Sequence, residues 1–165
     1  MHNELTREDL ALMRKELDYR RITLRPQLLE NVKVARGFGD LSENFEYKAA
    51  KQEKNRNESR IRFLENMIRT AVVVEKSAGD GVGLYDRVTV YIPEDDLRET
   101  YQIVTTVRQD ALHGRISKES PVGRALLGRK AGETVTIDAN GGSYDMVIEK
   151  IEPGEDDGSA PLNQY

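Results

Sequence analysis

The first half of the chain has an apolar side chain at nearly every third or fourth position, which is the spacing of one helix face. Thr6 predicts the helix start, because Asp9 follows three residues later and nearly completes a capping box. The pattern breaks at Gly37 and Gly39 and then resumes to about residue 74, which predicts an antiparallel hairpin with arms about 45 Å long. The apolar positions of the first arm are Leu10, Met13, Leu17, Leu24, Leu28, Val32 and Ala35.

The first arm is irregular at its middle. The apolar series misses one step near Arg20 and Arg21, and Pro26 lies inside the helical pattern shortly afterwards. An interior proline destabilises a helix by about 3 kcal/mol or forces a kink. We therefore expect a bend near Leu24 and Arg25.

In the second half the period changes from helical spacing to alternation, which predicts half-buried strands. Ser120, Pro121 and Gly128 carry the cap, first-turn and end signals of one short helix between the strands. These elements predict an α+β fold, in which a long helical hairpin is followed by a small antiparallel sheet domain with one short helix. The alternating strand positions are Val88, Val90, Ile92, then Ile103, Thr105, Val107, then Val135, Ile137, and finally Met146, Ile148.

Changes of composition set the expected domain boundaries. The hairpin is assigned to residues 1–76 and the sheet domain to 83–152. The glycine-rich stretch between them, 77–82, is predicted to be a linker, and residues 153–165 a disordered tail.

Composition excludes several classes of protein. The chain has 165 residues and no cysteine, so a disulfide scaffold and a thiolate metal site are excluded, and two histidines make a histidine site improbable. No apolar run approaches the roughly 20 residues of a membrane span, and the charged N-terminus is unlike a signal peptide, so we expect a cytoplasmic protein without membrane contact. Residues 1–75 carry 15 Lys and Arg against 13 Asp and Glu, whereas the rest carry 10 against 16.

The most informative segment is the hairpin tip, GDLSENFEY at 39–47. Asp40, Glu43 and Glu46 bring three carboxylates within seven residues, and such oxygens suit a hard cation such as Mg²⁺. The same spacing also fits an N-cap and its capping-box partner at a helix start, where negative charge is favourable. Spacing alone leaves both interpretations open.

A basic run follows the tip. Residues 48–62 contain six Lys and Arg against two Glu, a pattern that fits either a surface for a phosphate backbone or a solvated helix face. Phe38, Phe45 and Tyr47 lie near these cations, where aromatic rings can stack on bases or close the end of a hairpin.

The tip segment GDLSENFEYKAAK at 39–51 resembles that of the bacterial Gre transcript-cleavage factors, more closely the GreA type. Three further segments are similar to the same family: Arg25 and Pro26 with LLENVKVAR at 28–36, RIRFLENMI at 60–68, and ISKESPVGRALLGRKAGETVTI at 116–137. The resemblance covers about residues 5–152. It implies an N-terminal coiled coil and an FKBP-like C-terminal domain.

The resemblance also implies a function. Such a factor is not itself an enzyme: it binds bacterial RNA polymerase as a monomer, inserts the coiled coil through the secondary channel, and stimulates the polymerase's own cleavage of backtracked RNA. Asp40 and Glu43 would be the catalytic pair and would hold Mg²⁺ jointly with the polymerase. By the same resemblance, the RNA 3′ end would meet Lys48, Lys51 and Arg56, the tip would be supported by Ser42, Asn44, Glu46 and Tyr47, and Ser120, Pro121 and Gly123 would dock on the polymerase.

Some residues depart from the family pattern. Arg20 takes a place that is often apolar, and Phe38 and Phe45 are bulkier than expected at the tip. A channel-binding inhibitor without cleavage stimulation is therefore the alternative within this fold. Outside it, the alternatives are a prolyl isomerase, which needs an aromatic-lined pocket, and a coiled-coil chaperone or nucleic-acid arm, which does not need the acidic tip.

Overall fold

The computed structural model describes residues 2–39, 44–76 and 79–164, and these form two compact units. One unit is Leu10–Ala71, the helical hairpin; the other combines Met1–Asp9 with Val72–Tyr165. The domain boundaries predicted from the sequence assign all of residues 1–76 to the hairpin, whereas the structure groups the first nine residues with the sheet domain. The reason is a short parallel pairing of β1 (Glu4–Leu5) with β2 (Val72–Val73).

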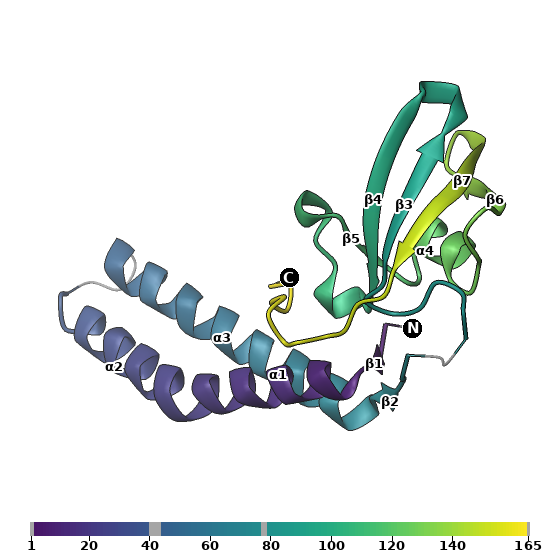
Figure 1. Ribbon diagram of the computed structural model, residues 1–165. Coiled ribbons are helices and arrows are strands. Elements are labelled where there is room, and N and C mark those ends of the chain that lie inside the picture. Colours follow the sequence, from purple (N-terminus) through teal and green to yellow (C-terminus); the bar gives the residue numbers. More distant parts are fainter. Residues whose placement is uncertain (1, 40–43, 77–78, 165) are drawn as a thin grey trace. The chain divides into compact units, whose positions relative to one another are not determined.

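The predicted hairpin and sheet are both present, so the α+β fold class is confirmed (Figure 1). The first arm consists of α1 (Arg7–Asp18), a π-helical stretch η1 (Tyr19–Leu24) and α2 (Arg25–Arg36), and the second arm is α3 (Phe45–Thr70). Helix α1 begins at a capping box, in which the Asp9 amide donates to Thr6 Oγ1 (3.1 Å) and the Thr6 amide to Asp9 Oδ2 (2.8 Å). The buried apolar side chains of the arms include Leu10, Met13, Leu17, Leu28, Ala35, Ile61, Leu64 and Met67.

The π-helical stretch explains how the first arm contains Pro26 without ending. The Arg25 amide donates to the Arg20 carbonyl, five residues back, and Pro26 follows in the first turn of α2. A proline has no N–H, and in a regular helix its ring clashes with the carbonyl four residues earlier. The wider π turn moves that carbonyl away, so the helix changes its hydrogen-bond register here.

The missing apolar step of the first arm is filled by a buried polar layer. Glu16 accepts from Arg20 Nε (2.7 Å) and Arg60 Nε (2.7 Å), and Arg20 also donates to Asn57 Oδ1 (2.9 Å). Burial by itself raises the pKa of Glu16, but the hydrogen bonds from Arg60 and Arg20 outweigh it and leave that pKa below its ordinary value. Arg60 therefore belongs to the hairpin interior and not to an exposed basic surface.

The sheet has the order β5-β4-β3-β7-β6 and covers its core with the short helix α4 (Pro121–Leu126). Its pairs are antiparallel except β4–β5, which is parallel and was not predicted. The predicted alternation through Thr105 and Val107 was wrong, because β4 ends at Val104 and a 3₁₀ turn, η3 (Thr106–Arg108), follows. The remaining strands are β3 (Arg87–Ile92), β4 (Leu97–Val104), β5 (Arg115–Ser117), β6 (Thr134–Ala139) and β7 (Gly142–Glu152), with 3₁₀ turns η2 (Pro93–Asp95) and η4 (Ala111–His113).

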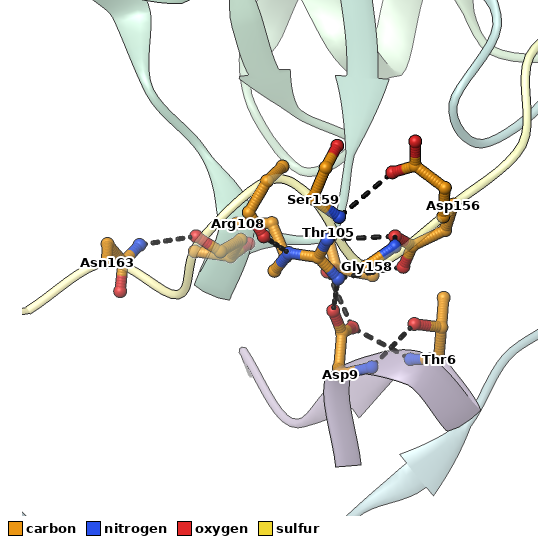
Figure 2. Close-up of polar contacts among 11 residues, drawn as sticks. Thr6, Asp9, Thr105, Arg108, Asp156, Gly158, Ser159 and Asn163 are labelled. Carbon is orange, nitrogen blue, oxygen red and sulfur yellow. Dashed lines mark hydrogen bonds and ion pairs between the residues drawn. The ribbon is translucent and has the colours of Figure 1, made fainter. Parts of the chain in front are cut away.

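One buried arginine joins the two ends of the chain within this unit (Figure 2). Arg108 has no exposed side-chain surface; it donates to Asp9 Oδ1 (3.0 Å) and pairs with both carboxylate oxygens of Asp156 (2.7 and 2.8 Å). Asp9 also accepts from Thr105 Oγ1 (2.7 Å), and Asn163 donates from its backbone to Val107 (2.9 Å). Residues 153–164, which the sequence predicted to be disordered, follow a defined path through these contacts.

Candidate functional site: the hairpin tip

The tip segment 39–47 connects α2 to α3 in the sequence. Asp40, Ser42 and Glu43 lie outside the described residues, and the described part of the site consists of two flanks. The first flank is the end of α2 with Gly37, Phe38 and Gly39, and the second is Asn44 with the first turns of α3. Gly39 has φ +124°, a conformation that favours glycine over residues with a Cβ.

Asn44 joins the two flanks and caps α3. Its Oδ1 accepts from the Tyr47 amide (3.0 Å), and its Nδ2 donates to the Ala35 carbonyl near the end of α2 (2.6 Å). The sequence analysis considered Asp40 and Glu43 as the cap of a helix that starts at the tip. The structure begins α3 at Phe45 and gives the cap to Asn44, so the N-cap position of this helix is filled without Asp40.

Two phenylalanines are exposed beside the tip. Phe38 is 66% exposed and Phe45, the first residue of α3, is 81% exposed. This exposure does not favour the interpretation that Phe38 and Phe45 close the end of the hairpin. Lys48 instead stands 5.8 Å from the centre of the Phe45 ring, within the range of a cation–π contact.

Tyr47 lies between cations from both flanks. The Arg36 guanidinium is 5.6 Å and the Lys51 ammonium 6.0 Å from the centre of its ring. A hydrogen bond from Arg36, together with the nearby Lys51 charge, lowers the pKa of the Tyr47 hydroxyl. The supporting role expected for Tyr47 therefore has a physical basis, since the ring connects α2 to α3. Glu46 is exposed in the first turn of α3.

The basic run divides into different environments. Lys48, Lys51 and Arg56 are exposed, as a phosphate-binding surface would need. Arg60 is buried in the polar layer with Glu16, and Arg62 donates to Ser59 (3.0 Å) on its own helix. Sequence reasoning could not separate these residues, because the burial of Arg60 depends on which residues the first arm places opposite it.

The segment expected to dock on a partner, Ser120–Gly123, has a clear local role. Ser120 Oγ accepts from the Gly123 amide (3.0 Å) and caps α4, and Pro121 occupies the first turn. A Cβ on Gly123 would lie 2.0 Å from the Ser117 carbonyl oxygen, so only glycine fits there. Of the three residues, Pro121 is the exposed one.

Arg36 as a tip residue and the second hydrogen bond of Asn44, to Ala35, were not predicted from the sequence. Arg36 ends a helix four residues before the acidic segment, and its partner Tyr47 is distant in sequence, so only the hairpin pairing reveals the contact. The signal for Asn44 was present, because Asn is a favoured cap and α3 begins directly after it.

Among the described residues, no group of three or more His, Asp or Glu side chains is placed to hold a metal ion. No described helix combines the length and apolar character needed to cross a bilayer. A cavity of about 580 Å³ beside β5 has no aromatic side chain in its lining, and two smaller cavities of the same unit each have one, Tyr85.

Comparisons with known proteins match both parts of the chain. Residues 3–73 match the family model described as transcription elongation factor, N-terminal, and residues 76–153 match transcription elongation factor, GreA/GreB, C-term. Transcription elongation factor GreA of Geobacillus kaustophilus (strain HTA426) is 46% identical over 150 residues, which cover 90% of this chain and 95% of that protein. The same factor of Streptococcus pneumoniae serotype 19F (strain G54) is 43% identical, with coverages of 90% and 94%.

Among solved structures, the chain is similar to the GreA factor homolog 1 (Gfh1) protein of Thermus thermophilus. The two are 28% identical with a TM-score of 0.42, and the match covers 91% of this chain and 98% of that one. The two sequence matches, one over the helical hairpin and one over the small sheet domain, define the class of the protein as a transcription elongation factor. The chain belongs to the GreA/GreB family of these factors.

Proposed function

We propose that this chain binds bacterial RNA polymerase in the cytoplasm, inserts the hairpin tip through the secondary channel, and stimulates the polymerase's own cleavage of backtracked RNA. The observation that carries the proposal is the capping of α3 by Asn44. Because Asn44 fills this position, the helix does not need the carboxylates of Asp40 or Glu43 as its N-cap, and we assign them to the chemistry.

The hairpin has the dimensions for such an insertion. Helix α3 alone has 26 residues, which corresponds to about 39 Å. The buried polar layer and the tie between Asn44 and Ala35 hold the arms together along this length. Such an arm can present its tip at a site inside a large partner while the sheet domain stays outside.

The tip would complete a metal site and not form one alone. Carboxylate oxygens are the ligands that Mg²⁺ prefers, and Asp40 and Glu43 supply a partial set whose other members would come from the polymerase. When bound, the Mg²⁺ neutralises developing charge on the phosphate and activates a water. The two carboxylates would orient that water, and the exposed Lys48, Lys51 and Arg56 would hold the RNA 3′ segment by its phosphates.

The sheet domain would dock on the polymerase through the Ser120–Gly123 segment. Ser120 and Gly123 are used internally to shape the turn, so direct contact would come from the exposed Pro121 and its surroundings. We propose that the factor acts as a monomer, since one tip serves one active site.

The test is a cleavage assay on a stalled, backtracked elongation complex. Wild-type protein is expected to release 3′ RNA fragments, and Asp40→Ala or Glu43→Ala to abolish the release while polymerase binding persists. Glu53→Ala changes an exposed acid further along α3 and is the matched control, which should stimulate cleavage as the wild type does. Wild-type protein that binds but releases no fragment would refute cleavage stimulation and indicate the channel-binding inhibitor instead.

A further inference from the structure

The first residue of α3 presents an aromatic ring to solvent at the end of a cationic face. Residues 3, 7 and 11 positions after Phe45 lie on the same side of the helix, and these are Lys48, Gln52 and Arg56. All four side chains are exposed. Lys48 contacts the ring of Phe45, and Arg56 forms no hydrogen bond or ion pair with the residues that the structure describes.

The charges around this face are arranged asymmetrically. The acids Glu46 and Glu53 lie about 100° and about 80° around the helix from Phe45, on the side opposite Lys48. Lys48 therefore faces away from both acids, and Arg56, about 20° around the helix from Phe45, lies between the two sides; a bound polyanion would approach from the Lys48 side. The positive end of the helix dipole lies at Phe45 and adds to the attraction.

We propose that Phe45 is a base-stacking residue for single-stranded RNA, with Lys48 and Arg56 contacting the phosphates that follow the stacked base. The inference rests on the proposed function and deepens it, because it names the contact that the RNA 3′ segment makes with the tip. An exposed ring next to cations is the combination that single-strand binding proteins use, since every base offers a π-face and every nucleotide a phosphate. A ring buried inside the hairpin would not have this capacity.

The test uses the free full-length protein and needs no polymerase. The chain has no tryptophan, so Phe45→Trp introduces a single fluorescent reporter at the site. Titration with a short single-stranded RNA at low salt should quench its emission, because a stacked base contacts the indole directly. Leu112→Trp, at a position 95% exposed in the sheet domain, is the matched control and should not be quenched.

Two further measurements separate stacking from simple charge attraction. Phe45→Ala should weaken the affinity for a labelled RNA by about tenfold. Lys48→Gln or Arg56→Gln should weaken it as well and reduce its dependence on salt concentration. Equal quenching of the Phe45 and Leu112 tryptophans, or unchanged affinity in Phe45→Ala, would overturn the proposal. Loss of binding to RNA-free polymerase in Phe45→Ala would also overturn it, since the ring would then be a protein contact.

The outcomes for the two proposals can be distinguished. If Asp40→Ala abolishes RNA cleavage and the Phe45 tryptophan is not quenched, cleavage stimulation stands and stacking is refuted. If the tryptophan is quenched but the wild-type protein releases no RNA fragment, stacking stands and cleavage stimulation is refuted.

Discussion

Replacing Arg108 with methionine tests whether the two ends of the chain stabilise the sheet unit through one guanidinium. The change keeps an apolar stem of similar length and removes the hydrogen bonds to Asp9, Asp156 and the Ala160 carbonyl. Asp9 has no exposed side-chain surface and Asp156 only 7%, so both carboxylates would lose their cationic partner in a buried setting.

The expected loss follows from what each carboxylate keeps. Breaking a buried pair by removing one partner costs about 3–5 kcal/mol. Asp9 still accepts from the Thr6 amide (2.8 Å) and from Thr105 (2.7 Å), so we expect the lower end, about 3 kcal/mol. With a urea slope of about 2 kcal/mol per molar, the midpoint would fall by about 1.5 M.

The assay is urea unfolding combined with hydrogen exchange of the β4 amides, which reports the sheet unit separately from the hairpin. Asp156→Asn is the matched control: Arg108 keeps Asp9, so the loss should be smaller, about 1–2 kcal/mol. A loss below about 1 kcal/mol in Arg108→Met would refute the reasoning, because the network would then contribute no more than an exposed pair.

The pH dependence of the same variant has a definite sign. Burial by itself raises the pKa of Asp156, but hydrogen bonds from Arg108 and the Gly158 amide leave that pKa lowered. A carboxyl group whose pKa is lowered in the folded state stabilises that state at pH values above its pKa in the unfolded chain. This stabilisation is lost as the pH falls through the pKa of the folded state. In Arg108→Met burial dominates and raises the pKa, so acid should destabilise the variant less than the wild type.

Three other substitutions test the remaining structural arguments by urea unfolding and hydrogen exchange. Gly123→Ala should lower the free energy of unfolding by about 1–3 kcal/mol, because the new Cβ would lie 2.0 Å from the Ser117 carbonyl oxygen. Gly79→Ala is the control and should be near neutral, because no atom lies within 4 Å of its Cβ position. Equal losses in the two variants would contradict this argument. Asn44→Ala should lower the free energy of unfolding by about 1–2 kcal/mol and speed hydrogen exchange in the first turn of α3. Asn44→Asp keeps the cap but loses the hydrogen bond to the Ala35 carbonyl, so its stability should lie between those of Asn44→Ala and the wild type. Arg60→Met should cost about 2 kcal/mol through loss of its bonds to Glu16, and no effect would show that the polar layer is not stabilising.

The sequence predicted the local elements well where the signal is local. The capping box of Thr6 and Asp9 and the cap at Ser120 depend on neighbouring residues and were confirmed. The buried seam of the hairpin also follows from spacing, since its period is that of the helix.

The features that were not predicted share a physical cause: each depends on a contact with a residue that is distant in the sequence. The apolar series of the first arm misses a step at Arg20, and the structure fills it with a polar layer in which Asn57 and Glu16 bind this residue. The alternation stops at Val104, and the 3₁₀ turn that follows contains Arg108, whose partner Asp9 lies more than 90 residues earlier. At the tip, the hydrogen bond from Asn44 to Ala35 and the exposure of Phe45 depend on how α2 and α3 meet.

The grouping of residues 1–9 with residues 72–165 has a consequence for synthesis of the protein. The hairpin is an insertion within the sheet unit and has all its own contacts once residue 71 has been made. In the sheet unit, Asp9 pairs with Arg108, which in turn pairs with Asp156. On the ribosome the hairpin can therefore fold first and β1 can pair with β2 soon afterwards, whereas Asp9 stays without its buried cation until Arg108 and Asp156 have been made.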